Sequence, residues 1–167
     1  MKVLIFGPSG SGKTYLSSQL KNLGINSADA DLIDGLSSWF DGKGNKVKYP
    51  VDADQEFLDN HEFLWDRDFL KSYLNQNSNI YLFGVAGNFS DMLDLFDRVY
   101  FLKAPPEVIM DRLTHESREN PMGQTEYQRQ NAVNWGLQLE QKAKDLKIPF
   151  LDATLKPEEI LKQIETD

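Results

Sequence analysis

Near the start of the chain stands the stretch Gly7-Pro8-Ser9-Gly10-Ser11-Gly12-Lys13-Thr14, directly after the apolar run Val3-Leu4-Ile5-Phe6. It has the spacing G-x-x-x-x-G-K-[ST] of a phosphate-binding loop between a strand and a helix. Glycines let backbone N–H groups turn toward phosphate oxygens, the lysine reaches the outer phosphates, and the threonine hydroxyl suits Mg²⁺. The following helix adds about half a positive charge at its N-terminus. The stretch predicts binding of a nucleoside triphosphate.

A helix is expected directly after this loop. Leu16, Leu20 and Leu23 have helical spacing, and Gly24 is a typical helix stop. Tyr15 lies at the start of this helix and is a further candidate contact for the nucleotide. The candidate nucleotide-binding residues of this segment are therefore Gly7, Pro8, Ser9, Gly10, Ser11, Gly12, Lys13, Thr14 and Tyr15, of which Lys13 is also a catalytic candidate.

The composition of the 167-residue chain excludes several classes of function. The chain has 18 Lys and Arg against 26 Asp and Glu, a net charge of -8, which disfavours nucleic acid or an anionic membrane as partner. Without cysteine there are no disulfides or thiolate metal sites, and two histidines make a zinc site improbable. No signal-peptide pattern and no apolar run of about 20 residues is present. We expect a single-domain cytoplasmic protein, monomeric or homodimeric.

Apolar runs alternate with helical patterns along the whole chain, which indicates an α/β fold around a parallel sheet. Strands are expected at 3–6, 25–28, 80–83, 98–102 and 149–151. A long helix should follow the capping-box pattern at Thr125 to Gln128, and a last helix should begin at Pro157. Two segments interrupt the alternation. Residues 35–66 contain a turn cluster at 41–45 that joins two short strands or forms a flap, and residues 114–124 resemble a lid.

Carboxylates follow the second expected strand. The sequence Asp29-Ala30-Asp31 ends this strand, and Asp34 comes three residues later. Because the carboxyl ends of parallel strands face the ligand crevice, Asp29 and Asp31 should lie near the phosphate loop. One is suited to Mg²⁺ and the other to the hydroxyl of a second substrate. The alternative is that Asp31 or Asp34 only caps the following helix; otherwise Asp34 is a further substrate contact.

The third expected strand ends without an acid. Gly84 and Gly87 follow it, and they indicate either a tight turn or close approach of the substrate to the backbone. The missing acid shifts the metal-binding role toward Asp29. Three arginines lie in or beside the lid segment: Arg112, Arg118 and Arg129. Arg118, inside the segment, is the catalytic candidate for stabilising a transferring phosphoryl group, whereas Arg112 and Arg129 are ligand contacts or solvated surface residues.

This arrangement resembles the nucleoside monophosphate kinase-like branch of the P-loop kinases, which includes adenylate kinase, shikimate kinase and gluconate kinase. The resemblance covers most of the chain. It is carried by the loop at 7–14, the pair Asp29 and Asp31, the glycines at 84 and 87, the lid at 112–123, and the sequence Asp152-Ala153-Thr154.

The resemblance implies a three-layer α-β-α sandwich with a five-stranded parallel sheet in the order 2-3-1-4-5. It implies ATP as donor, with Mg²⁺ at Thr14 and Asp29, an adenine site formed by Asp152, Ala153 and Thr154, and Arg112 beside the base. It also implies a substrate-binding insert, matched in position by residues 35–75.

Departures from the family pattern bear on the acceptor. Enzymes similar to adenylate kinase hold the acceptor phosphate with arginines, but the insert offers only Arg67. The leading hypothesis is therefore an ATP-dependent kinase of a small polar metabolite or nucleoside, with Asp31 at the acceptor hydroxyl. One alternative is a nucleoside monophosphate kinase whose phosphate clamp uses Arg67 and lysines such as Lys43, Lys46 or Lys48. The other is a nucleotide-binding switch, although no Asn-Lys-x-Asp guanine motif is present.

Overall fold

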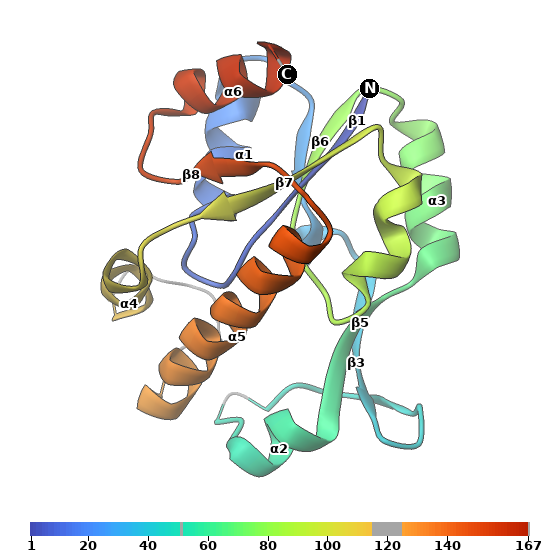
Figure 1. Cartoon of the computed structure of the whole chain (residues 1–167). Helices are drawn as coiled ribbons and strands as arrows, with labels where there is room; N and C mark the ends of the chain where they lie inside the picture. The colour runs from blue at the N-terminus through green and yellow to red at the C-terminus, as the bar shows by residue number, and fades with distance from the viewer. Residues whose placement is uncertain (51, 115–124, 167) are drawn as a thin grey trace.

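A five-stranded parallel sheet, in the order β2-β6-β1-β7-β8, forms the centre of the structure (Figure 1). The computed structural model describes residues 1–50, 52–114 and 125–166. The strands of this sheet are β1 (Lys2–Phe6), β2 (Ser27–Asp29), β6 (Ile80–Phe83), β7 (Arg98–Lys103) and β8 (Phe150–Asp152). Counted along the chain, the order is 2-3-1-4-5, so the expected fold class is confirmed.

Helices cover both faces of this sheet. One face packs on α1 (Lys13–Asn22) and α6 (Pro157–Thr166), and the other packs on α3 (Arg67–Gln76), the 3₁₀ helix η2 (Phe89–Leu95) and α5 (Glu126–Asp145) (Figure 1). In β1, Val3 and Ile5 belong to the first core, whereas Leu4 and Phe6 belong to the second. A strand that is buried on both faces has no polar positions, which explains its uninterrupted apolar sequence.

The helix α4 (Pro106–Thr114) follows β7 and packs against α5. Ile109 and Leu113 of α4 share a small core with Ala132 of α5. The expected lid at 114–124 begins at the last residue of α4, and residues 115–124 lie outside the described residues. Within the described part of the chain, no helix has both the length and the apolar character needed to cross a membrane.

A second, antiparallel sheet lies beyond the carboxyl end of β2. It has the order β4-β3-β5 and consists of β3 (Ser37–Asp41), β4 (Lys46–Val47) and β5 (His61–Trp65). The short helix α2 (Gln55–Asn60) precedes β5, and a 3₁₀ turn, η1 (Ala30–Leu32), precedes β3. The turn cluster at 41–45 joins β3 to β4, as one of its two interpretations predicted, and the Asp41 carboxylate accepts hydrogen bonds from the Lys43 and Asn45 N–H groups.

Aromatic rings fill one face of this second sheet. The ring of Trp39 lies 5.1 Å from Tyr49, 5.4 Å from Phe63 and 5.5 Å from Phe57, measured between centroids. Such contacts stabilise the pairing of strands beyond the area that they bury. The second sheet therefore has a small core of its own, which we call the insert core.

The second sheet is joined to the main sheet over a short boundary. The Asp66 N–H donates to the Leu36 carbonyl at 2.8 Å, so the chain enters and leaves the sheet at neighbouring positions. After β6, the side chain of Asn88 donates to the Trp65 carbonyl and accepts from the Trp65 N–H, both at 3.0 Å. These contacts fix the insert beside the carboxyl ends of β2 and β6.

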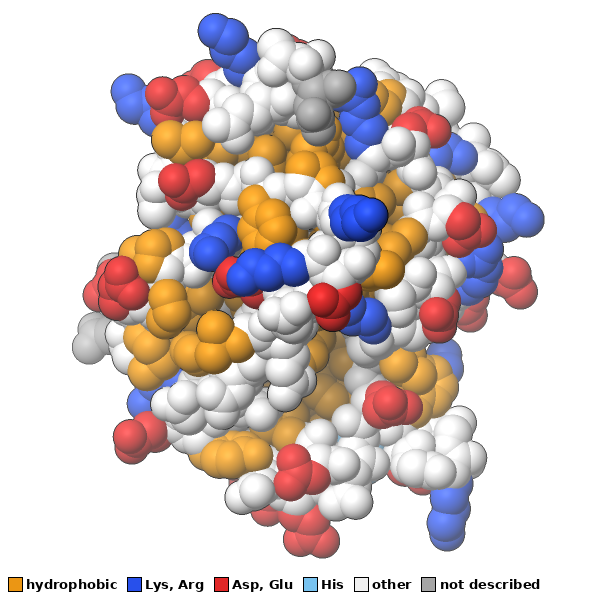
Figure 2. Space-filling model, in the orientation of Figure 1, with side chains coloured by type: hydrophobic (Ala, Val, Ile, Leu, Met, Phe, Trp, Pro, Cys, Tyr) orange, Lys and Arg blue, Asp and Glu red, His pale blue; other side chains and the backbone are white. Residues whose placement is uncertain are grey.

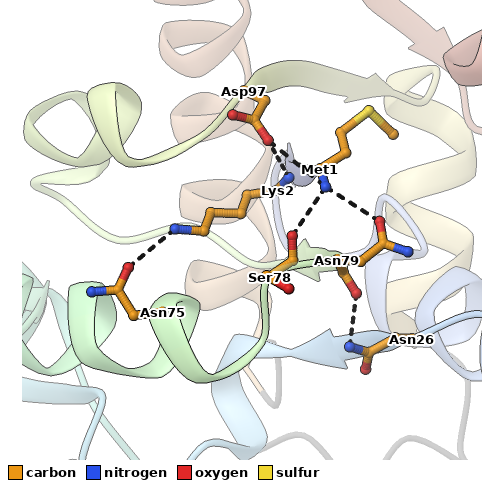
Figure 3. A network of polar contacts seen from close by, with 7 residues as sticks. All are labelled: Met1, Lys2, Asn26, Asn75, Ser78, Asn79 and Asp97. Carbon is orange, nitrogen blue, oxygen red and sulfur yellow. Dashed lines mark hydrogen bonds and ion pairs between the residues drawn. The ribbon is translucent and has the colours of Figure 1, made fainter.

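The opposite end of the main sheet, at the amino ends of its strands, is held by polar contacts of a different kind (Figure 3). The Asp97 carboxylate, just before β7, accepts the Lys2 N–H at 2.6 Å and lies 4.0 Å from the ammonium group of Met1. The same ammonium group donates to the Ser78 carbonyl at 3.0 Å, and the Lys2 ammonium donates to Asn75 at 3.2 Å. The amino ends of β1, β6 and β7 are thereby tied together, far from the phosphate loop.

Candidate functional site

The expected phosphate loop connects β1 to α1 in the structure. Gly10 and Gly12 have φ values of +84° and +99°, a region that residues with a side chain rarely adopt. A Cβ atom on Gly7 would lie 2.7 Å from the Leu102 carbonyl of β7, so any larger residue would displace the loop. The loop pattern thus reflects steric demands that the fold itself imposes.

The side chain of Lys13 curls over the loop. Its ammonium group donates to the carbonyls of Gly7 at 2.8 Å and Pro8 at 2.9 Å. Thr14 and Tyr15 follow in the exposed first turn of α1. This turn has no acidic residue, so the positive end of the helix dipole is not neutralised from within the helix. The region is suited to an anion.

The two helices that flank residues 115–124 both press on the phosphate loop. From α4, Ile109 and Leu113 pack so closely on Gly10 that a Cβ there would lie 3.1 Å from atoms of each. From α5, Gly136 approaches Pro8, and a Cβ on Gly136 would lie 3.0 Å from the proline ring. The loop is therefore held between its own strand and both of these helices.

A pocket of about 270 Å³ adjoins the loop on the side of α6. It is lined by Ser11, Gly12, Tyr15, Leu16, Leu102, Arg112, Ala153, Thr154, Leu155, Lys156, Pro157 and Ile160. Four candidate nucleotide-binding residues that lie far apart in the sequence thus border one cavity: Tyr15, Arg112, Ala153 and Thr154. Asp152 lies behind it, where its carboxylate accepts the Thr154 N–H at 2.8 Å and hydroxyl at 2.6 Å. These bonds lower the pKa of Asp152 and shape the loop.

Asp29 and Asp31 lie at the end of β2, beside the phosphate loop. Asp29 is buried, and its carboxylate accepts the Asp31 N–H at 3.0 Å. The surrounding protein displaces water from the Asp31 carboxyl and raises its pKa, the charge of Lys13 opposes this rise, and the charge of Asp29 adds to it. Asp31 is exposed to solvent, but its carboxyl still interacts electrostatically with both Lys13 and Asp29. Lys13, Asp29 and Asp31 form one electrostatic group.

The donor set fits Mg²⁺. This ion takes oxygen ligands and commonly keeps several waters, so one or two protein oxygens with the phosphates are sufficient. Thr14 offers a hydroxyl beside the loop, and Asp29 has a second carboxylate oxygen beyond the one that accepts the Asp31 N–H. Consistent with so small a protein contribution, no group of three or more His, Cys, Asp or Glu residues with metal-site geometry occurs among the described residues.

Gly84 and Gly87 serve packing between the two sheets. A Cβ on Gly84 would lie 2.5 Å from the Ala30 side chain and 3.1 Å from the Trp65 ring. The Gly87 N–H donates to the Phe63 carbonyl at 2.7 Å. Both glycines allow the insert to approach the carboxyl end of β6. Their direct contact with a substrate stays a prediction.

The structure gives less support for the other candidate site residues than for the group formed by Lys13, Asp29 and Asp31. Asp34 lies in an exposed turn before β3, and among the described residues no hydrogen bond or ion pair joins it to Asp31. Arg129 lies in the first turns of α5 and is half-buried. Arg118 lies outside the described residues, so its role stays a prediction.

Arg67 is engaged by a partner away from the phosphate loop. Its guanidinium group donates to both carboxylate oxygens of Asp94, at 2.8 and 2.7 Å, and also to the Asp91 carbonyl. The hydrogen bonds to Asp94 raise the pKa of Arg67 further and lower the pKa of Asp94. The one arginine that the insert segment offered for a phosphate clamp is therefore paired with a carboxylate.

Sequence reasoning missed several residues that shape the site. Gly136 is an isolated glycine inside a long helical pattern, which is a recognised signal of close packing. Asn88 gave no such signal, because its two bonds to Trp65 depend on how the second sheet docks. Gln128 was expected only as part of a helix cap, yet its buried amide also donates to the Ala53 carbonyl of the insert at 2.9 Å. That contact joins α5 to the insert.

The fold and the loop together define a P-loop nucleotide-binding protein. The family model described as "AAA domain" matches residues 3–134. The chain belongs to this family. No curated protein matches the chain in sequence.

Solved structures of small-molecule kinases share the fold over nearly the whole chain. Shikimate kinase from Bacteroides thetaiotaomicron is 13% identical with a TM-score of 0.56, covering 98% of this chain and 96% of that one. Shikimate kinase from Acinetobacter baumannii, in complex with shikimate, is 16% identical with a TM-score of 0.55, covering 98% and 92%. A gluconokinase from Sinorhizobium meliloti 1021 is 13% identical with a TM-score of 0.52, covering 96% and 87%. The likeness establishes the fold of the P-loop small-molecule kinases.

Proposed function

We propose that the protein is a kinase that transfers the γ-phosphoryl group of ATP to a hydroxyl group of a small polar metabolite or nucleoside. The observation that carries this proposal is the group formed by Lys13, Asp29 and Asp31 at the mouth of the phosphate loop. Lys13 supplies positive charge to the phosphates, and Asp31 is the carboxylate placed to meet an acceptor. Because ATP is an intracellular substrate, we place the activity in the cytoplasm.

On the donor side, the loop amides and Lys13 hold the phosphates, and the pocket beside Tyr15, Arg112, Ala153 and Thr154 holds the base. Mg²⁺ at Thr14 and Asp29 would neutralise charge on the phosphate oxygens. On sequence grounds alone, Arg118 supplies further positive charge to the transferring group.

On the acceptor side, Asp31 orients the hydroxyl group and accepts its proton. A bond forms between the acceptor oxygen and the γ-phosphorus while the bond from that phosphorus to the β–γ bridging oxygen breaks, and ADP leaves. The raised pKa of Asp31 makes it a better proton acceptor than an ordinary aspartate. The proton then passes from Asp31 to water.

A hydroxyl acceptor is favoured over a nucleoside monophosphate by the pairing of Arg67. Binding of an acceptor phosphate by this residue would require breaking its two hydrogen bonds to Asp94. Acceptors that carry no phosphate do not incur this cost. Asp34, Gly84, Gly87 and Arg129 remain the proposed further contacts for such an acceptor.

The test is an assay of ADP release with Mg²⁺ and ATP against three acceptor groups: neutral polyols and nucleosides, sugar acids and other hydroxy acids, and nucleoside monophosphates. We expect release to be stimulated by a hydroxyl compound and to be lost in Asp31→Asn, with ATP binding retained. Stimulation by monophosphates alone would instead support the phosphate acceptor. Tight ATP binding without stimulation in any group would support a switch and contradict the proposal.

A further inference from the structure

Arg112 connects three backbone carbonyls on two separate segments. From the last turn of α4 its Nη1 atom donates to the Ser11 carbonyl at 2.8 Å and to the Gly10 carbonyl at 3.4 Å. Its Nη2 atom donates to the Ala153 carbonyl at 3.3 Å. The guanidinium group is half-buried between the phosphate loop and the segment after β8. Both sides of the nucleotide pocket are therefore attached to one side chain.

These bonds constrain the direction of the loop amides. A trans peptide unit is planar, and its C=O and N–H bonds point in opposite directions. When the Ser11 carbonyl points toward Arg112, the Gly12 N–H of the same peptide unit must point away from Arg112. The Gly10 carbonyl, which also accepts from Arg112, shares its peptide unit with the Ser11 N–H. That N–H donates to the Pro8 carbonyl at 3.2 Å and closes the turn.

The steric arrangement supports the same role. Gly12 has the left-handed φ of +99°, and a Cβ on it would lie 3.1 Å from Nη1 of Arg112. The guanidinium group thus occupies the space beside the loop that only a glycine leaves open. Its charge is also carried on a planar group with several donors, which suits it to bridging carbonyls in a way that a lysine ammonium group does not.

We infer that Arg112 is a positioning residue that presets the phosphate loop for the triphosphate chain, in addition to bordering the base pocket. It acts through the Gly10 and Ser11 peptide units and needs no contact with the phosphates. The inference rests on the donor half of the proposed function and is independent of the acceptor.

The experiment compares two ligands by isothermal titration calorimetry: ATP, and inorganic tripolyphosphate, which has the phosphate chain without a base. The variants are Arg112→Lys, which keeps the charge but not the planar group, and Arg112→Ala. Tyr15→Ala is the matched control, because Tyr15 borders the same pocket, whereas the side-chain donor to the Gly10 and Ser11 carbonyls is Arg112. We expect both Arg112 variants to bind ATP and tripolyphosphate about tenfold more weakly, by similar factors, since charge-assisted hydrogen bonds are lost. Tyr15→Ala should weaken ATP alone.

Three results would overturn the inference or its basis, and they differ from one another. If the Arg112 variants lose affinity for ATP but bind tripolyphosphate as the unaltered protein does, Arg112 serves the base only. If they melt at a lower temperature but bind both ligands normally below that temperature, its role is only structural. If the unaltered protein binds neither ligand, the proposed ATP-dependent function fails instead. Arg112→Lys keeps the test decisive if Arg112→Ala does not fold.

Discussion

At the scale of single residues, the site places a negative charge where the fold does not favour it. Asp31 is the clearest case, because the surrounding protein and the charge of Asp29 together outweigh Lys13 and raise its pKa. A carboxyl whose pKa is higher in the folded state than in the unfolded chain favours folding at low pH. It opposes folding at pH values above both pKa values. At pH 7 the charge of Asp31 is therefore a cost to stability.

The variant Asp31→Asn tests this cost. We expect its melting temperature at pH 7, measured without nucleotide, to exceed that of the unaltered protein, because the amide carries no charge. The same change should lower kcat by about 10²- to 10⁴-fold if Asp31 accepts the acceptor proton. A variant that melts at a lower temperature, with kcat unchanged, would contradict both the electrostatic reading of Asp31 and its catalytic role.

Lys13 is the second residue with a direct prediction. Its ammonium group is held by the Gly7 and Pro8 carbonyls, so its charge stays over the loop. Lys13→Met should lower the rate of phosphoryl transfer by orders of magnitude, since positioning and charge stabilisation provide most of the catalysis. The check is single-turnover ADP formation at saturating ATP. Full turnover in this variant would contradict the assignment of the loop.

At the scale of elements, α5 approaches the phosphate loop closely at Gly136. Replacing a glycine in a helix by alanine normally stabilises the helix by about 1 kcal/mol. At Gly136, however, the added Cβ would lie 3.0 Å from Pro8. Overpacking of this kind costs about 1–3 kcal/mol. We expect Gly136→Ala to unfold at lower denaturant concentration, whereas Gln138→Ala on the exposed side should be nearly neutral; a more stable Gly136→Ala would refute the close contact.

The same helix is attached to β7 by one ion pair, between Glu140 and Lys103, and a second ion pair of Glu140 lies within the helix. The Glu140 carboxylate accepts from Lys144 at 2.8 Å and from Lys103 of β7 at 2.9 Å. The hydrogen bonds of Lys144, and then those of Lys103, lower the pKa of Glu140 below its ordinary value of 4.5. The folded state therefore releases this proton more readily than the unfolded chain does. The stabilisation is fully present above pH 4.5 and is lost as the pH falls through the folded pKa.

Glu140→Gln should accordingly lower the free energy of unfolding at pH 7 by at most about 1 kcal/mol, because the pair is partly solvated. The difference from the unaltered protein should shrink as urea denaturation is repeated at lower pH. Glu62→Gln is the control, since Glu62 is exposed and forms no ion pair within the described ranges. A difference that stays constant down to acidic pH would exclude this ion-pair explanation.

The strength of sequence inference also differs among elements. Strands buried on both faces, such as β1 and β6, could be located closely because only apolar residues fit there. The second strand was expected at 25–28 and forms at Ser27–Asp29, because its limits depend on pairing with β6 and not on its own weak propensity. The Thr125 cap of α5 was foreseeable from local chemistry, and its hydroxyl accepts the Gln128 N–H as expected. The contact between Gln128 and Ala53 joins residues 75 positions apart and has no local signature.

At the scale of the whole molecule, the two sheets divide the proposed work between them. The main sheet carries the phosphate loop, and the insert follows the carboxyl end of β2, where Asp29 and Asp31 lie. Acidic and basic side chains are interspersed over the face in Figure 2, so the net charge of -8 does not prevent local positive charge at the loop. The phosphate loop could be predicted from sequence because its motif is local. The acceptor side could not, because it depends on how the insert docks.

Asn88 is the residue that tests this docking. Asn88→Ala removes two hydrogen bonds to the backbone of Trp65, and we expect it to cost about 1–3 kcal/mol of stability. It should raise KM for the acceptor more than KM for ATP, because only the insert is loosened. Asn75→Ala, in α3 beside the amino end of β1, is the control and should leave both constants unchanged. Equal changes in both KM values would indicate that the insert and the loop are not separable.

The two ends of the segment that forms the second sheet lie next to each other, and this has a consequence for the evolution of the chain. The chain enters the second sheet after Leu36 and leaves it before Asp66, and the hydrogen bond between these two residues brings the ends of the segment 37–65 together. Replacement or gradual change of residues 37–65 would alter neither the strand order of the main sheet nor the sequence of the phosphate loop. Selection could therefore change what is phosphorylated without having to rebuild the machinery that delivers the phosphate.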